Sequence, residues 1–145
     1  MASVNLYLNF NGNCEEAFNF YKSAFGGEFK YIGRFNEMPP SENNPIPESE
    51  GNKIMHVSLP VGDGSFLMGS DTGGEWAPGF IPGNNFSISI NTTRKEEADK
   101  LFTSLSDGGK VTMPLSKTFW SEYFGMFTDK FGINWMVSFD GNQQK

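Results

Sequence analysis

The stretch Glu15-Glu16-Ala17-Phe18-Asn19-Phe20-Tyr21-Lys22-Ser23-Ala24-Phe25-Gly26-Gly27-Glu28-Phe29 has a counterpart later in the chain. The counterpart reads Glu96-Glu97-Ala98-Asp99-Lys100-Leu101-Phe102-Thr103-Ser104-Leu105-Ser106-Asp107-Gly108-Gly109-Lys110-Val111. Both copies begin with Glu-Glu-Ala, continue with apolar residues at helical spacing, and end in Gly-Gly before a strand-like segment. This ordered combination predicts a tandem duplication, and therefore two similar modules.

Each copy predicts one amphipathic helix with one apolar stripe. The stripes contain Ala17, Phe20, Tyr21, Ala24 and Phe25 in the first copy, and Ala98, Leu101, Phe102 and Leu105 in the second. Residues 11–13, Asn-Gly-Asn, are expected to cap the first helix, and Thr92 or Thr93 the second. The Gly-Gly pairs are expected to end both helices, because glycine accepts the left-handed conformation of a C-terminal cap.

Runs with strand character surround each helix. Alternating apolar residues precede the helices (Val4, Leu6, Leu8, Phe10 and Phe86, Ile88, Ile90), and further strands are expected at 29–35, 53–59, 65–69, 110–113, 123–128 and 133–139. The predicted class is α+β: two tandem β-α-β-β-β modules that form a curved mixed sheet with a concave cleft. We expect residues 1–145 to be one domain, with a first module at 1–70, a linker at 71–83 and a second module at 84–140. The proline-rich stretch 36–52 is expected to be a long exposed loop.

Composition narrows the possible partners. The chain of 145 residues has 11 basic and 17 acidic residues, a formal net charge of −6, which argues against nucleic-acid binding and against anionic membrane surfaces. No apolar run approaches the roughly 18 residues of a membrane span. Cys14 is the single cysteine and has no partner for an internal disulfide, and the first residues lack the pattern of a signal peptide. We therefore expect a cytoplasmic protein.

Alternation along the strands separates two faces. The faces turned away from the helices carry mostly polar or small residues: Asn5, Tyr7 and Asn9; Ile54, His56 and Ser58; Ser87, Ser89 and Asn91; Asn134, Met136 and Ser138. They are either an exposed sheet surface or the lining of a cleft. A lined cleft would take aromatic walls from Trp76, Phe119, Trp120, Tyr123 and Phe124, the usual composition of a small-molecule site.

Three segments carry a resemblance to a known family. They are residues 7–17, Tyr-Leu-Asn-Phe-Asn-Gly-Asn-Cys-Glu-Glu-Ala; residues 20–27, Phe-Tyr-Lys-Ser-Ala-Phe-Gly-Gly; and residues 108–115, Gly-Gly-Lys-Val-Thr-Met-Pro-Leu, with Thr118-Phe119-Trp120 and the run 129–135, Asp-Lys-Phe-Gly-Ile-Asn-Trp. Together they resemble the PhnB-like branch of the vicinal oxygen chelate superfamily, which includes glyoxalases, extradiol dioxygenases and bleomycin-resistance proteins. Members of this branch often carry a 3-demethylubiquinone methyltransferase label. A methyltransferase would need a site for a nucleotide-like cofactor. The chain has no glycine-rich strand-to-helix turn of the kind that holds one, so we expect no cofactor.

The resemblance implies a homodimer and a divalent metal held by His or Glu side chains from four strands. The corresponding positions are Asn5 or Tyr7, then His56, then Ser87 or Ser89, and finally Met136. His56 alone is a good ligand type, and it is the only histidine of the chain. Glu37, Glu122 and Asp71 are carboxylates that could be recruited, but their spacing does not support it. We therefore expect no superfamily metal site.

The sequence leaves three functions open. The first is a homodimer that binds an unidentified small molecule, with a cleft lined by Tyr7, His56, Ser87, Ser89, Trp120, Tyr123 and Met136 and with His56 as the candidate catalytic base. The second is a divergent metal-dependent lyase, isomerase or dioxygenase, and the third is an interaction protein with a vestigial cleft.

Four of the candidate residues could have structural roles instead of functional ones. His56 could instead be a hydrogen-bonded structural residue. Trp120 and Tyr123 could seal a seam between protomers instead of stacking on a ligand. Cys14 is expected to pack rather than to react.

Overall fold

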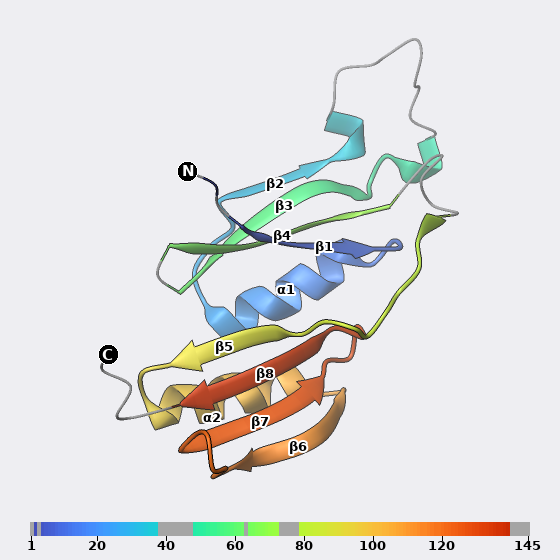
Figure 1. Ribbon diagram of the computed structural model, residues 1–145. Helices are drawn as coiled ribbons and strands as arrows, with labels where there is room; N and C mark the ends of the chain where they lie inside the picture. Colours follow the sequence, from blue (N-terminus) through green and yellow to red (C-terminus); the bar gives the residue numbers. More distant parts are fainter. Residues whose placement is uncertain (1, 3, 38–47, 63, 73–78, 140–145) are drawn as a thin grey trace. The chain divides into compact units, whose positions relative to one another are not determined.

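The computed structural model describes residues 2, 4–37, 48–62, 64–72 and 79–139. The chain divides into two compact units, Met1–Ile81 and Pro82–Lys145, each built from one helix and four strands (Figure 1). Most of the expected loop at 36–52, and Trp76 within the expected linker, lie outside the described residues.

The first unit has the order β-α-β-β-β. Its elements are β1 (Leu6–Phe10), α1 (Cys14–Phe25), β2 (Tyr31–Arg34), β3 (Ile54–Val61) and β4 (Ser65–Asp71), with short 3-10 turns at Phe35–Glu37 and Glu48–Glu50. The sheet order is β1-β4-β3-β2, with β1 parallel to β4 and the other pairs antiparallel. One face of this mixed sheet packs against α1 (Figure 1).

The second unit repeats this plan. Its elements are β5 (Ile88–Thr92), α2 (Lys95–Ser106), β6 (Lys110–Ser116), β7 (Tyr123–Thr128) and β8 (Asn134–Phe139), and the sheet order is β5-β8-β7-β6. The parallel pair runs from Leu6↔Leu67 to Phe10↔Asp71 in the first unit and from Ile88↔Trp135 to Thr92↔Phe139 in the second. The α+β class and the duplicated β-α-β-β-β order are therefore confirmed, with the strands grouped into two four-stranded sheets. The concave cleft stays a prediction.

The core of each unit forms between its helix and its sheet. In α2 the four expected stripe residues, Ala98, Leu101, Phe102 and Leu105, are all buried. In α1 the buried residues are Cys14, Ala17, Phe18, Tyr21 and Ala24. The expected stripe was therefore wrong at Phe20 and Phe25, which are both half-buried, and omitted Phe18. Phe18 fills the space above Gly69, where a Cβ would come within 2.7 Å of the Phe18 ring.

A buried aspartate, rather than the expected asparagine turn, holds the start of α1. Asn13 makes no side-chain capping bond. Instead, Asp71 at the end of β4 accepts hydrogen bonds from the backbone N–H groups of Gly12 and Cys14 through Oδ1 and from Ile54 N–H through Oδ2, each at 2.9 Å. Its carboxylate therefore joins α1, β3 and β4 and stabilises the positive end of the helix dipole.

The start of the second module also differs from expectation. Strand β5 begins at Ile88, and Phe86, expected on the helix-facing side, is 54% exposed. The residue before α2 is Arg94, without a side-chain cap, so neither Thr92 nor Thr93 caps this helix. Thr92 is buried, and its hydroxyl lies 3.0 Å from the carbonyl oxygen of Arg94 and 3.1 Å from that of Ser138.

The run 129–135 proves to be a hairpin turn organised by Asp129. Oδ1 of this buried carboxylate accepts the N–H groups of Phe131 and Ile133, and Oδ2 accepts the indole N–H of Trp135 at 2.8 Å. Trp135 is itself 1% exposed. This part of the third resembling segment is therefore a structural turn that fixes a core tryptophan.

Neither helix in the described part of the chain is long and apolar enough to cross a membrane.

Candidate functional site

The only histidine lies on the sheet face opposite α1. His56 is half-buried on β3, and its neighbour Val57 is fully buried. The hydroxyl of Tyr7 on β1 lies 3.1 Å from Nδ1 of His56, and the two rings are 5.5 Å apart between centroids. The structure thus brings together two of the expected site residues, from strands that are not adjacent in the sheet.

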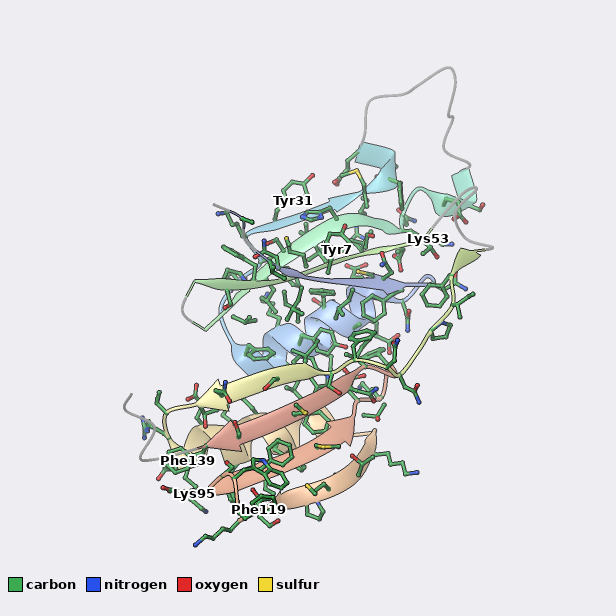
Figure 2. The ribbon with its side chains drawn as sticks, viewed as in Figure 1. Tyr7, Tyr31, Lys53, Lys95, Phe119 and Phe139 are labelled. Carbon is green, nitrogen blue, oxygen red and sulfur yellow. The ribbon has the colours of Figure 1, made fainter. Side chains whose placement is uncertain are left out.

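A second tyrosine completes this cluster. Tyr31 on β2 has its ring centroid 5.8 Å from that of His56, and it is 49% exposed (Figure 2). A Cβ on Gly33 would collide with the Tyr31 ring, so the glycine allows this ring to lie back over its own strand. Tyr31 was not among the site residues predicted from the sequence. The signal that could have revealed it is the alternation of Tyr31 with Gly33, opposite Ser58 and His56.

The Tyr7–His56 pair can provide either a donor or an acceptor of hydrogen bonds. If the Tyr7 hydroxyl donates to Nδ1, the imidazole carries its proton on Nε2 and can donate that proton to a ligand oxygen. In the opposite tautomer Nδ1–H donates to the tyrosine oxygen, and Nε2 accepts a proton. Within the described part of the chain, Nε2 has no hydrogen-bond partner, so it is the nitrogen available to a ligand.

The donor set of the first unit does not fit the divalent metal that the resemblance implies. The side chains next to His56 are two tyrosines, whereas such ions require several imidazoles or carboxylates. Of the carboxylates considered, Asp71 is buried and bonded to three backbone N–H groups, and Glu37 accepts the N–H of Arg34. Among the residues that the structure describes, no group of three or more His, Cys, Asp or Glu could hold a metal ion.

The other five expected site residues belong to the second unit. Ser89 on β5 is exposed and pairs with Met136 on β8, on the face opposite α2. Trp120 is 53% exposed, and its ring lies 5.6 Å from that of Phe124. Ser87 is exposed and precedes β5.

Tyr123 does not share the face of Met136. Its hydroxyl donates a hydrogen bond to Oδ1 of Asp99 on α2, and Lys95 of the same helix places its Nζ 4.5 Å from the ring centroid. The hydrogen bond to Asp99 raises the pKa of Tyr123, and burial raises it further. Tyr123 therefore fastens β7 to α2.

Cys14 and Arg34, two other residues with polar or ionisable side chains, have structural roles. Cys14 is 0% exposed, and burial, with the nearby charges of Asp71 and Glu15, raises the pKa of its thiol, so it packs as expected. Arg34 forms a two-point ion pair with Glu15 at 2.7 and 2.9 Å and donates to the carbonyl oxygen of Asn52. The hydrogen bond from Arg34 holds the pKa of Glu15 below its ordinary value.

Comparison with known proteins gives consistent results over nearly the whole chain. The family described as 3-demethylubiquinone-9 3-methyltransferase matches residues 2–138. Protein YjdN of Escherichia coli K12 is 34% identical over 138 residues, which cover 91% of each chain. The crystal structure of PA1353 from Pseudomonas aeruginosa has 40% identity and a TM-score of 0.82, with 97% of this chain and 98% of that chain covered.

A more distant neighbour shows the fold. A glyoxalase-related enzyme from Fulvimarina pelagi superposes with a TM-score of 0.60 at 16% identity, over 97% of this chain and 89% of that chain. The chain therefore has the glyoxalase-like fold that its sequence resembles.

Proposed function

This chain belongs to the family described as 3-demethylubiquinone-9 3-methyltransferase and has a glyoxalase-like fold, and we propose that it binds a ligand, as the fold suggests, and does not transfer methyl groups, as the family description says. The protein binds a small planar organic molecule at the tyrosine–histidine cluster, defined as Tyr7, Tyr31 and His56, without the superfamily metal. The observation that supports this most directly is the 3.1 Å contact between the Tyr7 hydroxyl and His56 Nδ1 on a half-exposed sheet face.

Methyl transfer is not favoured by the described residues. A nucleotide-like methyl donor is usually held by a doubly wound parallel sheet with a glycine-rich turn before a helix. Here each sheet is mixed, and the turn before α1 has its Gly12 and Cys14 N–H groups bonded to the Asp71 carboxylate. That carboxylate would repel a phosphate or another anion at the same place.

The cluster suits a neutral or weakly acidic ligand with an oxygen at the edge of a flat ring. Two tyrosine rings provide aromatic surface, and His56 Nε2 provides one donor or acceptor. If turnover occurs, His56 is the group that would accept or donate a proton, because its Nε2 can act as donor or acceptor according to the tautomer.

We also propose that the protein is a cytoplasmic homodimer. The homodimer follows from the family resemblance and from exposed aromatics such as Phe119 (98%) and Trp120 (53%), a residue class enriched at interfaces. The free, buried Cys14 fits a reducing compartment. Native mass spectrometry checks the dimer.

Titration with 4-nitrocatechol tests the proposed site, because this probe is planar and its absorbance reports its ionisation. Tyr7→Phe should weaken binding about 3- to 10-fold, the effect of one neutral hydrogen bond of roughly 0.5–1.5 kcal/mol. Tyr31→Leu should weaken it by a similar factor through lost ring contact. The matched control is Tyr123→Phe, which removes a hydroxyl bonded to Asp99 in the other unit and should leave binding unchanged.

Two results would redirect the interpretation. Equal binding by the wild-type protein and both cluster variants would place the probe elsewhere and reject the proposed site. Absence of binding up to millimolar probe would favour the interaction protein with a vestigial cleft.

A further inference from the structure

Three methionines form a row across the second sheet. Met136 on β8 pairs with Met126 on β7, and Met126 pairs with Met113 on β6. On the outer side of Met136 the row ends at Ser89 on β5. The chain has seven methionines, so three of them meet in one line across adjacent strands.

Met126 and Met136 lie on the face opposite α2. The neighbours of Met126 along β7 are Gly125, whose Cβ would meet the Phe102 ring at 2.6 Å, and Phe127, whose ring is 5.0 Å from that of Phe102. These neighbours face the helix, so Met126 faces the other way. Met136 likewise lies between the fully buried Trp135 and Val137.

The three methionines are half-buried, which leaves their side chains partly accessible while still shielded from bulk water. Phe124 lies on the same face as Met126, two residues away, and Trp120 contacts Phe124. An apolar border of this kind lowers the local polarity around the sulfur atoms. Hard cations, which need charged oxygen ligands, are disfavoured in such surroundings.

We propose that this methionine row, Met113, Met126 and Met136, binds a soft monovalent metal ion of the Cu(I) or Ag(I) type. Thioether sulfur is a soft, uncharged ligand that selects Cu(I) over hard divalent ions. Directly paired residues of neighbouring strands have Cβ atoms about 4.5–5.5 Å apart, and the flexible methionine side chain can turn two sulfur atoms toward one ion. Met126 pairs with Met136 in an unbroken register and with Met113 between two register shifts of β6. Met126 is therefore the central ligand, Met136 is its directly paired partner, and Met113 is the third ligand of the row.

The methionine row belongs to the second unit and the tyrosine–histidine cluster to the first. The first unit offers suitable controls in Met55 on β3 and Met68 on β4. Both are half-buried, as the methionines of the row are. In the register Met68 pairs with Tyr7 of β1 and Ser58 of β3, so no methionine stands directly beside it.

The test uses the full chain labelled with 13C at the methionine methyl groups. Titration with Ag(I), a redox-inert probe, in chloride-free buffer should saturate at one ion per chain and shift the methyl signals of the three row methionines, but not those of Met55 and Met68. Cu(I) affinity is then measured by competition with a chromogenic Cu(I) chelator. Mg(II) serves as the hard-ion control and should leave these signals in place.

Leucine substitutions identify the ligands. Met→Leu nearly conserves side-chain volume, so the variants should stay folded. Met126→Leu should weaken Cu(I) binding at least about 10-fold, and Met113→Leu and Met136→Leu should each weaken it less, whereas Met68→Leu should have no effect. Cys14→Ala should also leave binding unchanged, because the buried thiol is not a ligand.

Either of two results would overturn the proposal. The first is Ag(I) binding that is unchanged in Met126→Leu or lost in Cys14→Ala. The second is the absence of any shift in the row methyl signals at stoichiometric Ag(I), which would show that the row is an adaptable apolar surface only.

Discussion

The Tyr7 hydroxyl lies 3.1 Å from Nδ1 of His56, although the two residues are 49 positions apart and lie on strands separated by β4. This contact occupies Nδ1 of the imidazole with the tyrosine hydroxyl. The other ring nitrogen, Nε2, is then available as a donor or acceptor for a ligand. Among the described residues, no group of three or more His, Cys, Asp or Glu could hold a metal ion beside this pair. The proposed ligand site therefore depends on hydrogen bonding and ring contact.

Asp71→Asn should destabilise the first unit. The carboxylate accepts three backbone N–H groups, and an asparagine would place its own N–H₂ against one of these donors. An unsatisfied buried donor costs about 1–3 kcal/mol, so we expect a loss of roughly that size in the free energy of unfolding. Urea denaturation followed by circular dichroism measures it.

Asp129→Asn is the matched variant in the second unit, because Asp129 also accepts three N–H groups. It should cost a similar amount and should in addition change Trp135 fluorescence, since the indole N–H bonds to this carboxylate. Wild-type stability in both variants would contradict the structural role assigned to the two aspartates.

Stability at alkaline pH should depend on Cys14. Burial raises the pKa of this thiol in the folded state, whereas the unfolded thiol ionises near pH 8.5. Above that pH the unfolded state binds fewer protons than the folded state, so stability falls as pH rises, by up to about 1.4 kcal/mol per pH unit. Cys14→Ala should show a shallower decline between pH 9 and 10 in parallel urea titrations, and an identical slope would show that the thiol ionises normally.

Gly125→Ala should weaken the packing of β7 on α2. A Cβ at this position would meet the Phe102 ring at 2.6 Å and backbone atoms of Leu115 and Met113 at 3.0 Å. Overpacking of this kind costs about 1–3 kcal/mol. Gly79→Ala is the control, because its Cβ would meet nothing within 4 Å, and equal melting temperatures for the two variants would count against the close packing.

Treatment with EDTA should leave both stability and 4-nitrocatechol binding unchanged. The side chains next to His56 are tyrosines, which do not replace the imidazoles and carboxylates that divalent ions require. Metal analysis of protein purified without chelators is the accompanying measurement. One divalent ion per chain that disappears in His56→Ala would support the metal-dependent alternative instead.

The duplication was predictable from the sequence because helix stripes, strand alternation and Gly-Gly ends repeat in the same order. The predicted strand 123–128 matches β7 at both ends, since its alternation is uninterrupted. The helix caps were not predictable, because Asp71 reaches the start of α1 from a strand 57 positions away in the chain. Long-range side-chain bonds of this kind leave no local pattern.

The candidate site was predictable only in part. Strand alternation placed Tyr7 and His56 on one face, and the structure brings them into contact. Alternation also puts Tyr31 on the same strand face as Gly33, but the register that sets these two residues opposite Ser58 and His56 leaves no local pattern in the sequence. Tyr123 was assigned to the cleft from its position near Trp120, whereas a hydrogen bond with Asp99 turns it to the helix.

The most direct test of the ligand site uses the fact that the chain has one histidine. In protein labelled with 15N-histidine, every imidazole signal in the NMR spectrum belongs to His56. Titration with 4-nitrocatechol should shift the Nε2 signal in a saturable manner, with a weaker response in Tyr7→Phe and no dependence on EDTA. A Nε2 chemical shift that stays unchanged with 4-nitrocatechol but changes with stoichiometric Zn(II) or Mn(II) would contradict the account and identify His56 as a metal ligand.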